Sequence, residues 1–226
     1  QIFDPCNGLS DLKNKKLTFI GSADDRIQED YLRILRAIRF FAWLPGFYMP
    51  KNDMRALKRH QQKLSTISSE RITEEFSKLL MADDPVNSLR LAQKIGLDKH
   101  IFGFSFSLDN LEIEILKKFF LQLDWLARLV VITPNDKDEK INNVVRFSRK
   151  QRERFKRLMP NLTDVEAFEL TTNKWQKIAY WHALDLSEKI RICAIRKGFF
   201  FLDVPCFFPL FPSCSYSFSW CSPRSP

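Results

Sequence analysis

The sequence has few of the residues that build disulfide frameworks and metal sites. It contains 5 cysteines and 3 histidines among 226 residues. No two cysteines form a C-x-x-C pair, and His60, His100 and His182 have no ligand spacing to one another or to the cysteines. This excludes a disulfide-stapled secreted domain and gives no support to a zinc site. A reduced, cytoplasmic protein is therefore expected.

The sequence also lacks a visible signal peptide and a continuous apolar helix. The chain starts at Gln1 rather than Met, and we expect it to be the middle of a longer protein. Its last stretch, 198–226, is apolar, but Pro205, Pro209 and Pro212 rule out a continuous helix and argue against a membrane span. This stretch shows neither helical nor strand periodicity. We interpret it as a tail from a shifted or read-through frame without packed structure, with an apolar docking segment as the alternative.

Charge and periodicity predict a mainly α protein with a broad positive surface. The formal net charge is +9, and basic residues exceed acidic ones along the whole chain. This favours a polyanionic partner. Residues 1–21 read as short extended pieces. Helices are expected over Ile27–Leu44, Asp53–Gln62, Glu70–Met81, Pro85 to Gly96, one or two spans of 109–132, 149–158 and parts of 163–197.

The most informative stretch, 28–40, places acids one turn ahead of three arginines. Glu29 and Asp30 precede Arg33, Arg36 and Arg39 at helical spacing, so these side chains should gather along one side of a single helix. A carboxylate beside a planar guanidinium fork can read the edge of a planar ligand such as a nucleobase. The alternative is an amphipathic helix with ordinary ion pairs on its exposed face.

A second basic stretch covers 146–157 and contains a single acid, Glu153. Ser148 with Gln151 three residues later is a capping-box signature for a helix across 149–158. The basic side chains either contact RNA phosphates or form a solvated helix face. The candidate RNA-binding residues are Arg149, Lys150, Arg152 and Lys156.

Four ordered blocks together resemble the class II tRNA nucleotidyltransferases (CCA-adding enzymes) and the related bacterial poly(A) polymerases. The blocks are I-F-D-P-C-N-G-L-S-D-L (2–12), K-L-T-F-I-G (16–21), R-I-Q-E-D-Y-L-R-I-L-R-A-I-R-F (26–40) and S-S-E-R-I-T-E-E-F (68–76). The resemblance is strong over about 1–105, is weak but compatible to about 197, and does not cover the tail. It implies the end of a nucleotidyltransferase head (1–22), a neck (23–105), a helical tRNA-binding body and tail (106–197), and the unrelated stretch 198–226.

The resemblance also implies roles for individual residues. The block at 26–40 resembles the family's amino-acid template motif, E-D-x-x-R, which pairs with the Watson–Crick edge of incoming CTP or ATP. Asp30 and Arg33 would then pair with the base, with Glu29 orienting them. Arg36 and Arg39 would contact the nucleotide. Glu70 and Arg71, in the E-R-I-x-x-E block, would brace the template.

The sequence departs from the family in ways that matter for activity. Gly21-Ser22-Ala23 replaces Gly-Asp-Pro, and Tyr31 replaces proline after the template aspartate; we interpret both as drift. The family's catalytic head, with two aspartates that hold Mg²⁺, is missing, and the pairs Asp24-Asp25 and Asp83-Asp84 are explained by helix capping. This chain alone is therefore expected not to catalyse. The alternatives are the same region of a poly(A) polymerase and a non-catalytic helical RNA-binding module.

Overall fold

The computed structural model describes residues 3–112, 114–134 and 137–159 and four single positions, Glu188, Ile192, Ile195 and Arg196; at 115, 116 and 119 it describes the backbone only. Apart from those four positions, the expectations for 163–197 and for the tail 198–226 lie outside these residues. The described part is helical, and its one β feature is an isolated parallel bridge between Lys16 and Tyr48. The mainly α prediction is confirmed for this part of the chain.

The helices follow one another with short connections. No helix formed by the described residues is long and apolar enough to cross a membrane. The first half contains α1 (Gly8–Lys13), α2 (Ala23–Glu29), α3 (Arg33–Trp43), α4 (Lys51–His60) and the 3₁₀ helix η1 (Gln61–Thr66). The second half contains α5 (Ser69–Leu80), α6 (Pro85–Ile95), α7 (Leu97–Phe102), the 3₁₀ helix η2 (Asp109–Glu112), α8 (Glu114–Leu121), α9 (Trp125–Ile132), α10 (Asp138–Val144) and α11 (Arg149–Leu158).

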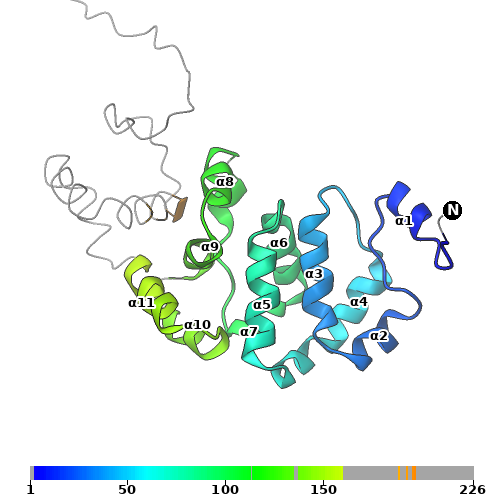
Figure 1. Cartoon of the computed structure of the whole chain (residues 1–226), viewed down its shortest axis with the longest axis horizontal. Helices are drawn as coiled ribbons and strands as arrows, with labels where there is room; N and C mark the ends of the chain where they lie inside the picture. The colour runs from blue at the N-terminus through cyan, green and yellow to red at the C-terminus, as the bar shows by residue number, and fades with distance from the viewer. Residues whose placement is uncertain are drawn as a thin grey trace, which may run out of the picture.

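Helix α3 is central to the packing of the first half. It packs against α5 and α6, while α2 packs against α4 beside it (Figure 1). Ile34, Leu35 and Ile38 form the inward stripe of α3 and are almost completely buried. Burying each such side chain is worth about 1.5–3 kcal/mol, so this stripe fixes which face of α3 points outward. The outward face carries the arginines.

The expected single helix across 27–44 is wrong, because the chain breaks between α2 and α3. Asp30 is extended, with φ −155° and ψ 106°. Its Oδ1 accepts a hydrogen bond from the Leu32 N–H at 3.1 Å, and its backbone carbonyl accepts from the Arg33 N–H at 3.0 Å. A short polar side chain that bonds the backbone two residues on competes with the helical ladder. Asp30 therefore ends one helix and helps to start the next.

The N-terminal segment also differs from the expected extended pieces. Residues 8–13 form α1, because both carboxylate oxygens of Asp4 accept from the first helical N–H groups, at 2.8 Å from Gly8 and 2.9 Å from Leu9. The stretch K-L-T-F-I (16–20), one of the expected extended pieces, pairs within the described residues only through the Lys16–Tyr48 bridge. The segment is held instead by Asp53 of α4, whose Oδ2 accepts from the Thr18 hydroxyl at 2.7 Å and the Phe19 N–H at 3.1 Å.

Several local predictions are confirmed at the level of individual bonds. The Ser148 hydroxyl accepts from the Gln151 N–H at 3.3 Å, and the Gln151 side chain accepts from the Ser148 N–H at 2.9 Å, so the capping box is present. Gly96 ends α6 with φ +82°, a left-handed conformation that a side chain would strain. Residues 109–132 form separate helices rather than one.

Candidate functional site

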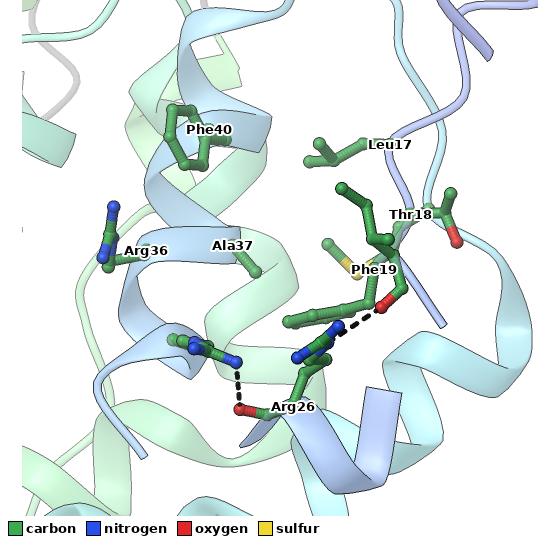
Figure 2. Close-up of a pocket in the computed structure, with 10 residues that line it drawn as sticks. Leu17, Thr18, Phe19, Arg26, Arg36, Ala37 and Phe40 are labelled. Carbon is green, nitrogen blue, oxygen red and sulfur yellow. Dashed lines mark hydrogen bonds between the residues drawn. The ribbon is translucent and has the colours of Figure 1, made fainter. Parts of the chain in front are cut away.

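A pocket of about 470 Å³ lies between the extended segment 17–20 and the outward faces of α2 and α3 (Figure 2). Apolar side chains form most of its wall, and three guanidinium groups border it. Its lining residues are Leu17, Thr18, Phe19, Ile20, Arg26, Arg33, Arg36, Ala37, Phe40 and Met49. An apolar surface with aromatic rings and planar cationic forks can hold a flat, hydrogen-bonding, anionic ligand.

Two of the three arginines at the pocket, Arg26 of α2 and Arg33 of α3, are held by a shared carboxylate. Arg33 Nη1 donates to Glu29 Oε2 at 2.6 Å, and Arg26 Nη1 donates to Glu29 Oε1 at 2.9 Å. The Arg33 guanidinium lowers the pKa of the Glu29 carboxyl most, and Arg26 lowers it further. Glu29 is therefore the acid that orients the two arginines.

Two backbone carbonyls complete this arrangement. Arg33 Nη1 also donates to the Arg26 carbonyl at 2.9 Å, and Arg26 Nε donates to the Ile20 carbonyl at 3.0 Å (Figure 2). Arg26 thus ties the segment that forms one wall to the helices that form the other. The remaining N–H groups of Arg33, on Nε and Nη2, make no hydrogen bond within the described residues and stay available to a ligand.

Arg36 lines the pocket one turn further along α3 and is exposed. Among the residues that the structure describes, none forms an ion pair or hydrogen bond with its guanidinium. A cation in this position, beside a fixed pair of arginines, suits a negatively charged group on the ligand.

Asp30 does not line the pocket, and both its carboxylate oxygens are engaged. Oδ1 accepts from the Leu32 N–H, and Oδ2 accepts from Arg71 Nη2 at 3.0 Å. The sequence placed Asp30 against Arg33 through side-chain stacking on one helix, whereas the structure pairs it with Arg71 of α5. A carboxylate has about four lone-pair positions, so Asp30 keeps acceptor capacity beyond these two bonds.

The remaining residues of the predicted template lie away from the pocket wall. Arg39 forms an ion pair with Glu75 of α5, Nε to Oε2 at 2.8 Å, and these side chains are only 17% and 11% exposed. Glu70 is exposed and lies 3.6 Å from Arg146 Nε rather than beside the α2–α3 break. Two residues of the E-R-I-x-x-E block therefore contact the predicted template. Arg71 binds Asp30, and Glu75 pairs with Arg39.

Part of the basic surface of α11 has no acidic partner among the described residues. Lys150, Arg152 and Lys156 are exposed and make no ion pair within the described residues, whereas Arg149 pairs with Glu153 at 3.1 Å. Arg154 turns away from this surface and binds Asp124 and Glu188, which raise its pKa against the desolvation that lowers it. The candidate RNA-binding residues therefore share one accessible helix.

Sequence reasoning missed Arg26 as a pocket residue. The signal was its position three residues before Glu29 in α2, a spacing that brings two side chains together on one helix. Within the described ranges, no group of three or more histidine, cysteine, aspartate or glutamate side chains could hold a metal ion.

Known proteins match about half of this chain in sequence. Residues 46–104 match the family model described as "Probable RNA and SrmB-binding site of polymerase A". The chain is 42% identical over 103 residues to the mitochondrial CCA tRNA nucleotidyltransferase 1 of Mus musculus, covering 44% of this chain and 24% of that protein. It is also 42% identical over 123 residues to the CCA-adding enzyme of Lactococcus lactis, covering 54% of this chain and 29% of that protein. The alignments thus span about a quarter of these relatives.

Solved structures share the fold over most of the chain. The CCA-adding enzyme of Thermotoga maritima, complexed with tRNA, matches with a TM-score of 0.63 at 20% identity, covering 86% of this chain and 50% of that one. The enzyme of Bacillus stearothermophilus in complex with CTP matches with a TM-score of 0.62 at 22% identity, covering 87% and 50%. In the regions that match, this chain is therefore similar in sequence and in fold to CCA-adding enzymes.

Proposed function

We propose that this chain is the nucleotide-selecting and RNA-binding part of an enzyme that adds C and A, from CTP and ATP, to the 3′ ends of tRNA. The observation that carries the proposal is the pocket in which Glu29 holds Arg33 beside Arg36, whose guanidinium has no partner in the described part of the chain. The relatives, which are CCA-adding enzymes by name, support the same reading.

The chemistry of the bases explains how Arg33, which lines the pocket, would select a base together with Asp30, which lies outside the lining. Cytosine and adenine both present an amino donor next to a ring-nitrogen acceptor, whereas guanine and uracil present a carbonyl at that position. In our proposal Asp30 accepts from the amino group with its remaining lone pairs, and Arg33 donates to the ring nitrogen. A carbonyl facing the Asp30 carboxylate leaves two acceptors opposed, which costs about 1–3 kcal/mol.

The other residues hold these two in place or contact the rest of the nucleotide. Arg36 binds the phosphates, because it is an exposed cation of the pocket that forms no ion pair within the described residues. Arg39 acts through its ion pair with Glu75 and orients α3 against α5. Glu29 and Arg71 position Arg33 and Asp30, and we assign Glu70 only a supporting role through Arg146.

We place tRNA phosphates on α11. Lys150, Arg152 and Lys156 project from one exposed helix without acidic partners among the described residues, and Arg149 extends the surface. Counterion release from phosphate contacts makes such binding strongly salt-dependent. The acceptor end of tRNA is the part that must lie near the pocket.

We further propose that this chain alone binds nucleotide without transferring it. Transfer in this family needs Mg²⁺ held by paired carboxylates. The carboxylates of the two adjacent aspartate pairs already have partners in part: Asp24 pairs with Arg59 and His60, at 2.5 Å and 2.9 Å, and Asp84 accepts from Asn87 at 2.5 Å.

The test uses the chain with tRNA that lacks its 3′ CCA, CTP, ATP and Mg²⁺. We expect CTP and ATP to bind and the tRNA to keep its length on a sequencing gel. Lengthened tRNA would overturn the proposed inactivity, and absence of binding by CTP, ATP and tRNA together would overturn the proposed function.

The second candidate is the same region of a poly(A) polymerase, which the description of the family model over residues 46–104 favours. The two enzymes differ in whether CTP is accepted. Equal binding of CTP and ATP supports CCA addition, whereas binding of ATP alone supports poly(A) addition.

We propose a cytoplasmic location because Cys6, the cysteine that lies in the described residues, is exposed and unpaired. A relative has a mitochondrial name, so the alternative location to test is the mitochondrion. Fractionation of cells that express the tagged protein should recover it with cytoplasmic rather than organellar markers.

A further inference from the structure

Helix α3 exposes two large aromatic side chains on the same side as the arginines of the pocket. Phe40 and Trp43 are 42% and 44% exposed. At 100° per residue, these two positions fall within an arc of about 80° that also contains Arg33 and Arg36. The buried stripe of α3 lies on the other side of the helix, so the core does not account for either ring. We call Phe40 and Trp43 the aromatic pair.

Contacts with α5 hold both rings in place. The indole Nε1 of Trp43 donates to the Lys78 carbonyl at 3.3 Å. The guanidinium of Arg39, which pairs with Glu75, lies over the Phe40 ring with its central carbon 4.5 Å from the ring centre. A ring that is already ordered loses little conformational entropy when a ligand stacks on it. The aromatic pair is therefore preorganised although it is exposed.

The aromatic pair continues the pocket along α3. Phe40 lines the pocket, and Figure 2 shows it at the opposite end of the pocket from Arg26. Trp43 lies three residues further on, at the last residue of α3 and beyond the pocket lining. Along its exposed side the helix thus presents first Arg33, then Arg36 and then the two rings.

This order matches the order of groups in a nucleotide and in the RNA end that receives it. In our proposed function Arg33 contacts the base and Arg36 contacts the phosphates. The 3′ hydroxyl of the RNA must reach the α-phosphate, so the last nucleotides of the RNA lie on the phosphate side of the base. The aromatic pair is what α3 exposes on that side. Because every nucleobase has a π-face, aromatic side chains bind unpaired bases of any sequence.

We propose that the aromatic pair stacks the unpaired bases at the 3′ end of the RNA that receives the nucleotide. Phe40 takes the terminal base, next to the pocket, and Trp43 takes the base before it. The contact is made with bases rather than with phosphates, and both residues precede the segment 46–104 that matches the family model. This inference rests on the proposed function, because it assumes that the chain binds RNA with its 3′ end at the pocket.

The test compares two RNA hairpins that share the acceptor stem of a tRNA and end in two unpaired 3′ nucleotides. One hairpin carries bases at both unpaired positions, whereas the other has abasic nucleotides there and keeps the same phosphates. Fluorescence anisotropy measures the binding of each hairpin, labelled in its loop, to the whole chain. We expect the wild type to prefer the hairpin with bases by at least about fivefold for each stacked base.

Leucine variants remove the flat rings but keep apolar side chains. Phe40→Leu and Trp43→Leu should each lower the preference by about fivefold or more, and the double variant should bind both hairpins alike. Trp43→Phe keeps a ring and should retain most of the preference. Phe3→Leu is the matched control, because Phe3 is 90% exposed and lies outside α3.

Two further measurements separate stacking from a general effect on the protein. The slope of log K against log salt should be the same in the wild type and in every variant, because the phosphate contacts are unchanged. Circular dichroism checks that each variant keeps the helix content and melting temperature of the wild type. Each single variant tests the inference alone, so a double variant that failed to fold would leave it falsifiable.

The outcomes distinguish this inference from the proposed function. A wild-type chain that binds neither hairpin nor tRNA would overturn the RNA-binding part of the proposed function and this inference with it. Equal binding of both hairpins by the wild type, or an unchanged preference in the leucine variants, would overturn this inference alone. Loss of CTP and ATP affinity in Phe40→Leu, with an unchanged preference between the hairpins, would assign that ring to the incoming nucleotide and contradict the inference.

Discussion

Asp30 and Arg71 are joined across two helices by an ion pair, Arg71 Nη2 to Asp30 Oδ2 at 3.0 Å. Asp30 ends α2, and Arg71 lies in the first turn of α5, where the helix dipole disfavours a cation and Asp30 compensates for it. The pair fixes the carboxylate that the proposed function assigns to base pairing. The pair therefore joins the E-R-I-x-x-E block at the start of α5 directly to the break between α2 and α3.

We predict that Arg71→Ala changes nucleotide preference more than stability. The side chains of Arg71 and Asp30 are 50% and 29% exposed, so their pairing contributes about 1 kcal/mol or less to the free energy of unfolding. The freed carboxylate loses its fixed orientation, and the preference for CTP and ATP over GTP and UTP should fall. Thermal melting and binding titrations with the four nucleotides check both parts. A large loss of stability with intact preference would contradict the prediction.

We predict that Glu29 titrates below the usual range of a glutamate and that Arg33→Ala raises its pKa. The folded-state pKa is lowered, chiefly by the Arg33 hydrogen bond. The contribution of Glu29 to stability is therefore present above its unfolded-state pKa and is lost as the pH falls through the folded-state value. Carboxyl carbon shifts followed by NMR against pH give the pKa.

Arg26→Ala is the matched control for that titration. Because Arg33 is the larger cause of the shift, the pKa of Glu29 should rise less in Arg26→Ala than in Arg33→Ala. Equal values in the wild type and in Arg33→Ala would show that Glu29 does not orient Arg33.

We predict that the Arg39–Glu75 pair contributes mainly to the packing of α3 on α5. Both side chains are largely buried, so Glu75→Ala leaves an uncompensated cation and should lower the free energy of unfolding by roughly 2–4 kcal/mol. The double variant Arg39→Leu/Glu75→Leu should be less destabilised than Glu75→Ala. Urea unfolding measures each. A double variant that lost as much as the sum of the losses in Arg39→Leu and Glu75→Leu would show that the pair is not coupled.

We predict that Asp53→Ala weakens nucleotide binding from outside the pocket. Asp53 holds the Thr18 hydroxyl and the Phe19 N–H, so its loss releases one wall of the pocket and costs about 1–3 kcal/mol of stability. Titration with CTP, together with thermal melting, measures both effects. Thr18→Val, which removes only one of the two bonds, should lie between the wild type and Asp53→Ala. Unchanged CTP affinity in Asp53→Ala would show that the wall does not depend on this residue.

Local signals in the sequence predicted the helices well where a single residue decides the boundary. Ser148 with Gln151 and the glycine at position 96 act through bonds and backbone angles within a few residues, so the pattern sufficed. The break at Asp30 was missed because apolar spacing continues across it, and because Asp30 was read only as a functional group. Helix α1 was missed because its capping acid, Asp4, lies four residues before the first bonded N–H group.

The sequence predicted most of the residues at the site, but it did not predict which side chains pair with one another. Glu29, Arg33 and Arg36 are close in sequence, so helical spacing placed them together. The partners of Asp30 and Arg39 come from α5, 41 residues away in the case of Arg71, and only the fold brings them into contact. Arg26 was overlooked because its contact with the Ile20 carbonyl depends on the extended segment before α2.

The central claim, that Arg33 in this pocket reads the nucleobase, is tested most directly by the affinities of CTP, ATP, GTP and UTP for the wild type and for Arg33→Ala. Lys94→Ala, which removes an exposed cation outside this pocket, serves as the matched control. We predict that the wild type and the control bind CTP and ATP about tenfold or more tightly than GTP and UTP, and that Arg33→Ala binds all four alike. An Arg33→Ala variant that keeps the preference of the wild type would contradict the claim.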